Sequence, residues 1–188
     1  LGDVYKRQQF YSYVDMDVLT KELCGLSRPV HFRGVCTVVT KLFNIVTPDR
    51  AYFGQKDAQQ LAVIKRMVKD LNMPLTITGC PIIREADGLA KSSRNTYLSA
   101  EERKAALVLS RAVKLGQELV QNGEKNADKV VGAMRALIEQ EPLARIDYVS
   151  AVDGLTMLPV HEINGGELVA MAVYIGKTRL IDNFSVEG

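Results

Sequence analysis

The sequence predicts an α/β protein: part of a doubly wound (Rossmann-like) parallel sheet, followed by a small α+β domain with antiparallel strands. Two observations favour this class. Between residues 51 and 79 a short apolar segment, a helical segment and a second strand-like segment follow one another, as in a βαβ unit. After residue 99, two helical stretches precede three strand-like segments separated by glycine-containing turns. Of the one or two domains that 188 residues allow, we expect two.

The overall composition is that of an ordered globular protein, with 47% hydrophobic and 24% charged residues. The net charge of +2 gives no reason to expect a nucleic-acid or membrane partner. Cys24, Cys36 and Cys80 show no CxxC or Cys/His spacing, which argues against a disulfide framework and a zinc site. We therefore assign no metal site. No apolar run approaches the roughly 20 residues of a bilayer span, so we expect a cytoplasmic protein.

The first elements are predicted from aromatic and apolar patterns. Aromatic and β-branched residues indicate a short strand over 10–14, and residues 16–25 indicate a short helix or turn. Apolar residues at helical spacing from Val35 to Val46 predict a helix that Pro48 and Asp49 end. The eight residues before this part, LGDVYKRQ, favour an artefactual leader, which we place at 1–9.

The βαβ unit has its own start and stop signals. The apolar segment 51–54 predicts a buried parallel strand, and Asp57 with Gln60 three residues later resembles a capping box. Asn72 and Pro74 end the helix, and the alternation over 75–78 predicts the second strand. The expected buried stripe of the helix consists of Leu61, Ile64, Val68 and Leu71.

A polar run without a clean period follows, so we place the domain boundary near its start, between domains 10–82 and 83–188. Ser99 and Glu102 form a capping box for a helix that runs to Asn122 and Gly123. We expect a second helix over about 128–141. Its inner face would carry Val130, Val131, Met134, Leu137 and Ile138, and strands are predicted over 146–152, 167–175 and 179–182.

Three polar segments could carry chemistry. In RPVHFRGV, Arg28, His31 and Arg33 can donate to a carboxylate or phosphate, although such a segment is more often a solvated loop. In FGQKDAQQ, a strand ends in glycine and a lysine precedes a helix, which favours phosphate at the carboxyl end of a parallel strand. A plain βα turn capped by Asp57 and Gln60 explains the second segment equally well.

The third segment, DGLAKSSRNTYLS, places two cations, hydroxyls and an amide in one loop. Such a loop can fold over a triphosphate, or it can be an ordinary interdomain linker. There is no GxxxxGK[ST], GxGxxG or HExxH, and neither Ser92 nor Ser93 stands in a GxSxG turn. P-loop, dinucleotide, zincin and acyl-enzyme chemistry therefore have no support, and His161 is given no role.

Taken together and in order, RPVHFRGV through FGQKDAQQ, then PIIREADGLAKSSRN, then YIGKTRLIDN, resemble the pantothenate synthetase family of the nucleotidylyltransferase superfamily, from about Tyr13 to Phe184. The resemblance implies an ATP-dependent ligase that joins pantoate to β-alanine through a pantoyl adenylate. It implies ATP with Mg²⁺ as cofactor and a homodimer when the protein is complete. The superfamily's HxGH motif is absent, so we expect a missing N-terminal segment and an inactive fragment.

Residue by residue, the resemblance implies roles for the matching positions. The ATP-binding set would be Gly54, Gln55, Lys56, Asp57, Ile83, Lys91, Ser92, Ser93 and Arg94. Lys56, Ser92, Ser93 and Arg94 would stabilise charge in catalysis, while Gln60, Arg28, His31 and Arg33 would lie on the substrate side. Many family members have Glu at position 55 and Met or Leu at position 91. Two other functions stay open: an adenylating or cytidylyl-transferring enzyme with another acid as substrate, and a noncatalytic binding module.

Overall fold

The structure, a computed structural model, describes residues 11–187. The expected leader at 1–9 and the first residue of the expected strand at 10–14 lie outside these described residues. The chain divides into two compact units, one ending at Cys80 and one beginning at Pro81. Within residues 11–187, no helix combines the length and the apolar character that crossing a bilayer requires.

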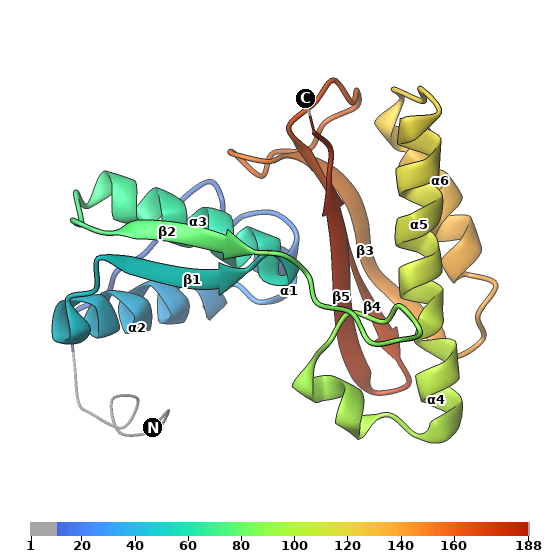
Figure 1. The fold of residues 1–188 in the computed structure, drawn as a ribbon, viewed down its shortest axis with the longest axis horizontal. Helices are drawn as coiled ribbons and strands as arrows, with labels where there is room; N and C mark the ends of the chain where they lie inside the picture. Colours follow the sequence, from blue (N-terminus) through green and yellow to red (C-terminus); the bar gives the residue numbers. More distant parts are fainter. Residues whose placement is uncertain (1–10, 188) are drawn as a thin grey trace. The chain divides into compact units, whose positions relative to one another are not determined.

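Unit one is a small parallel sheet with helices (Figure 1). The strands β1 and β2 pair in parallel, with Arg50 opposite Thr76 and Gly54 opposite Cys80. This confirms the predicted βαβ unit. Its elements are α1 (Cys24–Ser27), α2 (His31–Val46), β1 (Arg50–Gly54), the 3₁₀ turn η1 (Gln55–Asp57), α3 (Ala58–Asp70) and β2 (Thr76–Cys80).

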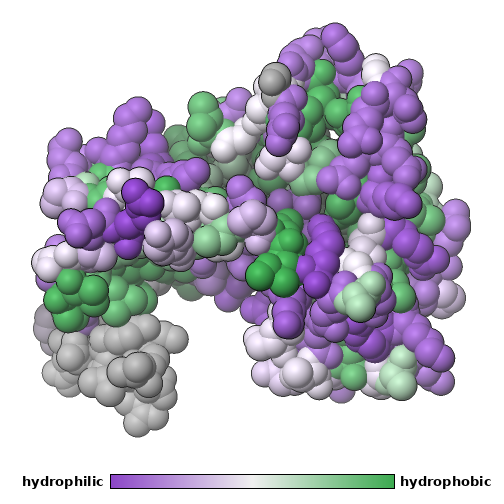
Figure 2. Space-filling model, viewed as in Figure 1, coloured by the Kyte–Doolittle hydropathy of each residue, from purple (hydrophilic) through white to green (hydrophobic). Residues whose placement is uncertain are grey.

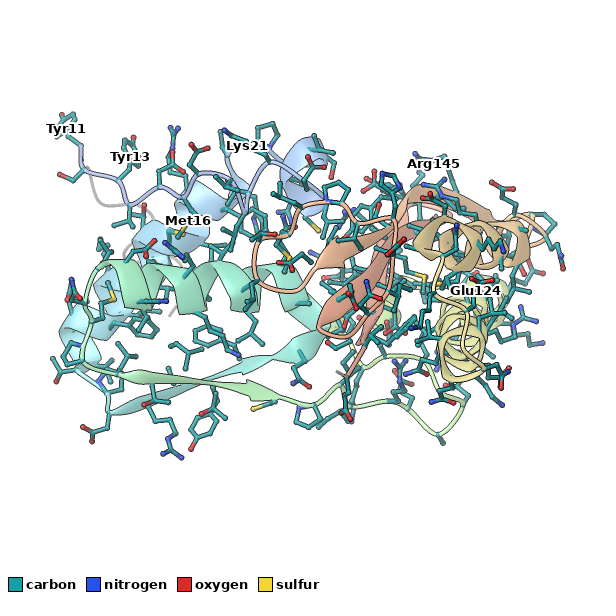
Figure 3. All side chains as sticks on the ribbon, turned by 90° about the horizontal axis from the view of Figure 1, so that it is seen from above. Tyr11, Tyr13, Met16, Lys21, Glu124 and Arg145 are labelled. Carbon is teal, nitrogen blue, oxygen red and sulfur yellow. The ribbon has the colours of Figure 1, made fainter. Side chains whose placement is uncertain are left out.

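Both long helices of unit one lie against the same face of the sheet. Phe43 of α2 packs edge-on against Phe53 of β1, with ring centroids 6.4 Å apart. Gly79 is the β2 partner of Phe53, and a Cβ atom at this position would face Leu61 of α3. Figure 3 shows the two strands running along one side of these helices. The opposite face carries Tyr52, which is 62% exposed, so in unit one the core forms on one side of the sheet.

Some expectations for the start of unit one are wrong. Residues 11–14 form no strand, because the main chain of Val14 pairs instead with the Thr37 hydroxyl, at 3.0 Å from its N–H and 3.3 Å from its carbonyl oxygen. In 16–25, turns precede α1, as the expectation of a short helix or turn allowed. The helix expected from Val35 begins at His31, because buried Phe32 extends its apolar stripe by one turn.

The capping box expected at Asp57 and Gln60 is also wrong. Asp57 makes no side-chain cap hydrogen bond, and the chain enters α3 through the 3₁₀ turn η1. The stripe of α3 was only partly right, since Leu71 lies beyond the helix end and is 49% exposed. Val63 and Met67 complete the stripe instead, and both are almost fully buried.

Unit two is a three-stranded antiparallel sheet with helices, in the strand order β3-β4-β5. The mixed α/β class with a parallel and then an antiparallel sheet is therefore confirmed. Residues from both helices and the sheet, among them Leu109, Met134 and Met171, share one buried core. Its elements are the 3₁₀ helix η2 (Ser93–Tyr97), α4 (Ala100–Ala105), α5 (Leu107–Gln121), α6 (Ala127–Ile138), β3 (Ala144–Asp153), β4 (Glu167–Ile175) and β5 (Thr178–Ser185).

The helices α5 and α6 are amphipathic, as predicted. Val130, Met134 and Ile138 of α6 are buried, with Val131 and Leu137 packed beside them. Hydrophilic side chains dominate the outer surface over α5 in Figure 2, where Arg111 and Lys114 are exposed. The helices therefore pack their apolar faces on the sheet and leave charged faces outside.

The capping box at Ser99 and Glu102 is confirmed, with Glu102 N–H donating to Ser99 Oγ at 3.2 Å and Ser99 N–H to Glu102 Oε2 at 2.8 Å. The stop at Gly123 is confirmed by its φ of +91°. The single helix expected between them is wrong, because it breaks at Ala106 into α4 and α5. There the N–H of Leu109 donates to Ala106 O at 3.1 Å, a tighter three-residue step.

The thiols of unit one should differ sharply in reactivity. Cys36 is 0% exposed, and burial, helped by the nearby Asp15 carboxylate, raises its pKa to about 11. Since the thiolate is the reactive form, only about 10⁻³ of Cys36 would be ionised at about pH 8. We expect iodoacetamide to modify half-buried Cys24 and Cys80 while leaving Cys36 unmodified, as measured by peptide mass spectrometry. In urea all three should react, and rapid labelling of native Cys36 would contradict this burial.

Candidate functional site

The turn that follows β1 carries the strongest candidate residues of unit one. Gly54 ends the strand, and Gln55, Lys56 and Asp57 form η1, which leads directly into α3. The turn thus lies at the carboxyl end of a parallel strand and at the N-terminus of a helix without a side-chain cap. Main-chain N–H groups at such a position favour an anion, and the Lys56 ammonium adds positive charge.

Gly79 keeps β2 close to this turn. A Cβ atom at position 79 would lie 3.0 Å from Leu61 Cδ2 and 3.3 Å from Gln55 Cγ. Both distances are tighter than ordinary packing, so a larger residue would push against the side chains of Leu61 in α3 and Gln55 in the turn. No role for Gly79 was predicted from the sequence.

Gln59 fixes the start of α3 to the segment 19–24, which comes much earlier in the chain, and this role was not predicted from the sequence. Its side chain is 5% exposed. Its Nε2 donates to Leu19 O at 2.9 Å and to Glu22 O at 2.7 Å, while Oε1 accepts from Cys24 N–H at 3.0 Å. The signal was present in the helical spacing, since Gln59 stands four residues before buried Val63. Gln60, the neighbour to which the resemblance gave a substrate role, is half-buried.

The RPVHFRGV segment forms a helix junction rather than one loop. Arg28 is exposed just after α1, and His31 is the first residue of α2, half-buried with its ring 5.1 Å from that of Phe32. Arg33 Nε lies 2.8 Å from Asp15 Oδ2, and its guanidinium lies 5.6 Å from the centre of the Tyr13 ring. The structure thus gives the Arg33 charge a partner within unit one.

In unit two, the Lys91–Asn95 loop begins at the end of a small hairpin. Ala90 forms an antiparallel bridge with Arg84, and Lys91 N–H donates to Ile83 O at 2.8 Å. Ser92 Oγ then accepts from Arg94 N–H at 3.2 Å and so begins η2. The side chains of Lys91, Ser93 and Arg94 are exposed, and Ile83 is 68% exposed. The loop therefore presents cations and hydroxyls from an ordered backbone.

A partly buried ion pair attaches this hairpin to the sheet. Arg84 contacts both oxygens of Asp182 in β5, at 2.7 and 3.0 Å. Asp182 is 1% exposed, and Arg84 Nη1 also donates to Gly88 O at 3.1 Å. Because losing Arg84 would leave the buried Asp182 carboxylate without its compensating charge, this contact attaches the hairpin to β5.

The candidate residues thus fall into two sets, each within its own unit. Unit one brings together the residues of the turn 54–57 and, on α3, Gln60. Unit two brings together Lys91, Ser92, Ser93 and Arg94. Main-chain amides, hydroxyls and cations are the groups that proteins use for phosphate. Each set can therefore contribute to binding an anionic, phosphate-bearing ligand.

Comparison with known proteins agrees with the resemblance. A family model described as "Pantoate-beta-alanine ligase" matches residues 2–185. A pantothenate synthetase from Ruminiclostridium cellulolyticum is 64% identical over 184 residues, which are 98% of this chain and 65% of the relative. One from Clostridium acetobutylicum is 62% identical over 174 residues, covering 93% of this chain and 62% of the relative. The chain therefore spans slightly less than two thirds of the length of these relatives.

Solved structures show the same fold. A crystal structure of pantothenate synthetase from Thermus thermophilus superposes with a TM-score of 0.92 at 42% identity, over 97% of this chain and 66% of that one. A pantoate-beta-alanine ligase from Francisella tularensis, complexed with "Beta-gamma ATP and Beta-alanine", has a TM-score of 0.69 at 30% identity, over 97% of this chain and 61% of that one.

The Gln59 contacts predict a marked loss of stability on substitution. Gln59→Leu leaves the Leu19 and Glu22 carbonyls and the Cys24 N–H without their partner. We expect the free energy of unfolding to fall by about 1 to 3 kcal/mol, the cost of unsatisfied buried polar groups. Urea denaturation measures it, and Gln60→Leu, at a position without such contacts in the described structure, is the control. Equal stability of both variants would contradict this stabilising role of Gln59.

Proposed function

The chain belongs to the pantoate-beta-alanine ligase family, and from this premise we propose that the complete protein is an ATP-dependent ligase that condenses pantoate with β-alanine. One observation carries the proposal beyond family membership. The turn 54–57, which holds Lys56, lies where the carboxyl end of a parallel strand meets the start of a helix. That is the position at which α/β sheets bind nucleotides.

The reaction we propose has two steps. A carboxylate oxygen of pantoate attacks the α-phosphorus of ATP, the bond between the α- and β-phosphates breaks, and pyrophosphate leaves. The amine of β-alanine then attacks the activated carbonyl carbon, loses a proton, and AMP departs. Neither step needs a nucleophile from the protein. The protein's task is to bring two anions together and to stabilise the charge that develops between them.

On the ATP side, Gly54, Gln55, Lys56 and Asp57 would contact the nucleotide through main-chain N–H groups and the lysine charge. Lys91, Ser92, Ser93 and Arg94 would approach its phosphates, with Ile83 on the adenine side. Support comes from the ordered turn and loop that present these residues, and from the ATP with which the Francisella relative is complexed. Lys56, Ser92, Ser93 and Arg94 would stabilise the departing pyrophosphate.

On the acid side, we assign Gln60 to pantoate. The role of Gln59 supports this, because Gln59 carries the hydrogen bonds to the segment 19–24 and no cap bond occupies Gln60 in the described structure. His31 and Arg28 lie near the start of α2 as further substrate-side candidates. Arg33 is the weakest of these, since Asp15 and Tyr13 already contact its guanidinium.

Magnesium would arrive with the triphosphate. Mg²⁺ keeps several of its waters and binds through substrate phosphates with one or two carboxylates. The exposed carboxylate of Asp57, beside Lys56, suits such a secondary contact. The ion would supply charge neutralisation on the phosphates.

We further propose that residues 10–82 bind ATP and pantoate and that residues 83–188 act as a lid. The complete protein would be a homodimer in the cytoplasm.

Lys56 gives the first test of this proposal. In a hybrid that joins the N-terminal segment of the Ruminiclostridium relative to this chain, Lys56→Ala should slow adenylation by about 10², because one preorganised charge-stabilising donor is lost. AMP release that requires both pantoate and β-alanine is the readout. Lys65→Ala, an exposed lysine further along α3, is the control and should keep the rate. Unchanged turnover in Lys56→Ala would remove Lys56 from the site.

The 188-residue polypeptide provides a second test. It contains two histidines, His31 and His161, and no HxGH motif, so we propose that alone it carries only part of the ATP site. With each missing charge-assisted bond worth about 1.5 to 3 kcal/mol, ATP should bind orders of magnitude more weakly than to the hybrid. Calorimetry and AMP assays compare the two. Robust ligase turnover by the 188 residues alone would overturn this part of the proposal.

A further inference from the structure

Glu85 stands at the centre of a polar network in unit two that none of the proposed ligand contacts uses. Its Oε1 accepts from Asn95 Nδ2 at 2.7 Å, and its Oε2 accepts from Arg103 Nη2 at 3.0 Å. The same Arg103 nitrogen lies 2.7 Å from Asp87 Oδ2. One carboxylate therefore connects the hairpin that precedes the Lys91–Asn95 loop, the last residue of that loop, and helix α4.

Asn95 closes the loop on itself. Its Nδ2 also donates to Ala90 O at 3.2 Å, just before the loop, and its N–H donates to Ser92 O at 3.1 Å, inside it. The two ends of the exposed segment 91–94 are thereby tied together by one side chain. Whatever fixes the Asn95 amide consequently fixes the backbone that presents Lys91, Ser92, Ser93 and Arg94.

Arg103, the second partner of Glu85, belongs to a well-anchored helix. It lies on α4, whose first turn is fixed by the capping box and whose Ala105 is buried in the core of unit two. Hydrogen bonds from Asn95 and then from Arg103 hold the pKa of Glu85 below its usual range. The carboxylate is thus ionised at neutral pH, and both bonds to it are charge-assisted.

The network leaves two buried polar atoms without a partner in the described structure, Asn95 Oδ1 and Arg103 Nη1. The contacts that the network makes fix a single loop geometry, because Asn95 and Arg103 each direct one donor group at Glu85.

We propose that Glu85 is a positioning residue, which acts through Asn95 and Arg103 to hold the Lys91–Asn95 loop in the conformation that receives the nucleotide's phosphates. This rests on the proposed function. A loop ordered before the ligand arrives binds without losing conformational freedom, and its donors need no reorganisation as charge develops. Glu85 itself touches neither substrate nor nucleotide.

Hydrogen exchange on the 188-residue polypeptide tests whether Glu85 holds the loop in place. Three amides report on the loop, those of Lys91, Arg94 and Asn95, each with a hydrogen bond in the structure. In Glu85→Gln we expect them to exchange about tenfold faster or more, because a charge-assisted bond is lost. Exchange in the core strand β4 should not change. Glu124→Gln, at a hydrogen-bonded carboxylate outside this network that accepts from the main-chain N–H of Asn126, is the control and should leave the loop as it was.

Kinetics of the hybrid protein test whether the loop held by Glu85 serves adenylate formation. We expect Glu85→Gln to lower kcat for adenylate formation about tenfold while the KM for pantoate stays unchanged, since the loop serves the phosphates. Asn95→Ala should give a similar loss, and the double variant should lose less than the product of the two single losses, because the two residues share the contact between Glu85 Oε1 and Asn95 Nδ2. A residue with a merely structural role would lower the melting temperature and leave kcat of the folded enzyme intact.

The outcomes separate the two proposals. Unchanged loop exchange in both Glu85→Gln and Asn95→Ala overturns the positioning role, and so does unchanged kcat in an active hybrid. Should Glu85→Gln fail to fold, Asn95→Ala decides by the same two measurements. An unsubstituted hybrid without AMP release contradicts the ligase proposal instead, and the exchange experiment, which needs no catalysis, still decides whether Glu85 holds the loop.

Discussion

The parallel pairing of β1 with β2 is the constraint on which unit one depends. Parallel neighbours cannot be joined by a tight hairpin, so the chain must cross over through α3. The crossover forces a turn between the carboxyl end of β1 and the start of α3, and that turn is Gly54–Asp57. Gly79 lets β2 lie close to the turn, and Gln59 attaches the helix start to the segment 19–24. The candidate phosphate site is therefore a consequence of strand direction.

In unit two, the main constraint is the ordering of the exposed polar Lys91–Asn95 loop. The loop has few apolar groups to bury, so packing cannot fix it. Ion pairs take that role: Arg84 joins the hairpin to Asp182 in β5, and Glu85 joins it to Arg103 in α4. Both partners belong to elements anchored in the core, so the loop inherits their rigidity.

Neighbouring polar residues in this chain carry different duties. Gln59 is buried and bonds the main chain, while Gln60 has no such contact in the described structure. Arg28 and Arg33 are both exposed, but within the described structure only Arg33 has an ion-pair partner, Asp15. Residue type alone does not separate these pairs, because glutamine and arginine serve equally well as structural partners and as ligand donors.

The sequence by itself determined the elements whose signals are local. The βαβ order, the Ser99–Glu102 capping box, the Gly123 stop and the three C-terminal strands all follow from short-range spacing and turn chemistry. Family-specific motifs likewise identified the chain's relatives. The tertiary structure alone decided the beginning of α2, the break at Ala106, and the partners of Gln59 and Glu85. The partners of Gln59 and Glu85 lie between 10 and 40 residues away in the chain, and a local pattern does not record which distant group will satisfy a polar atom.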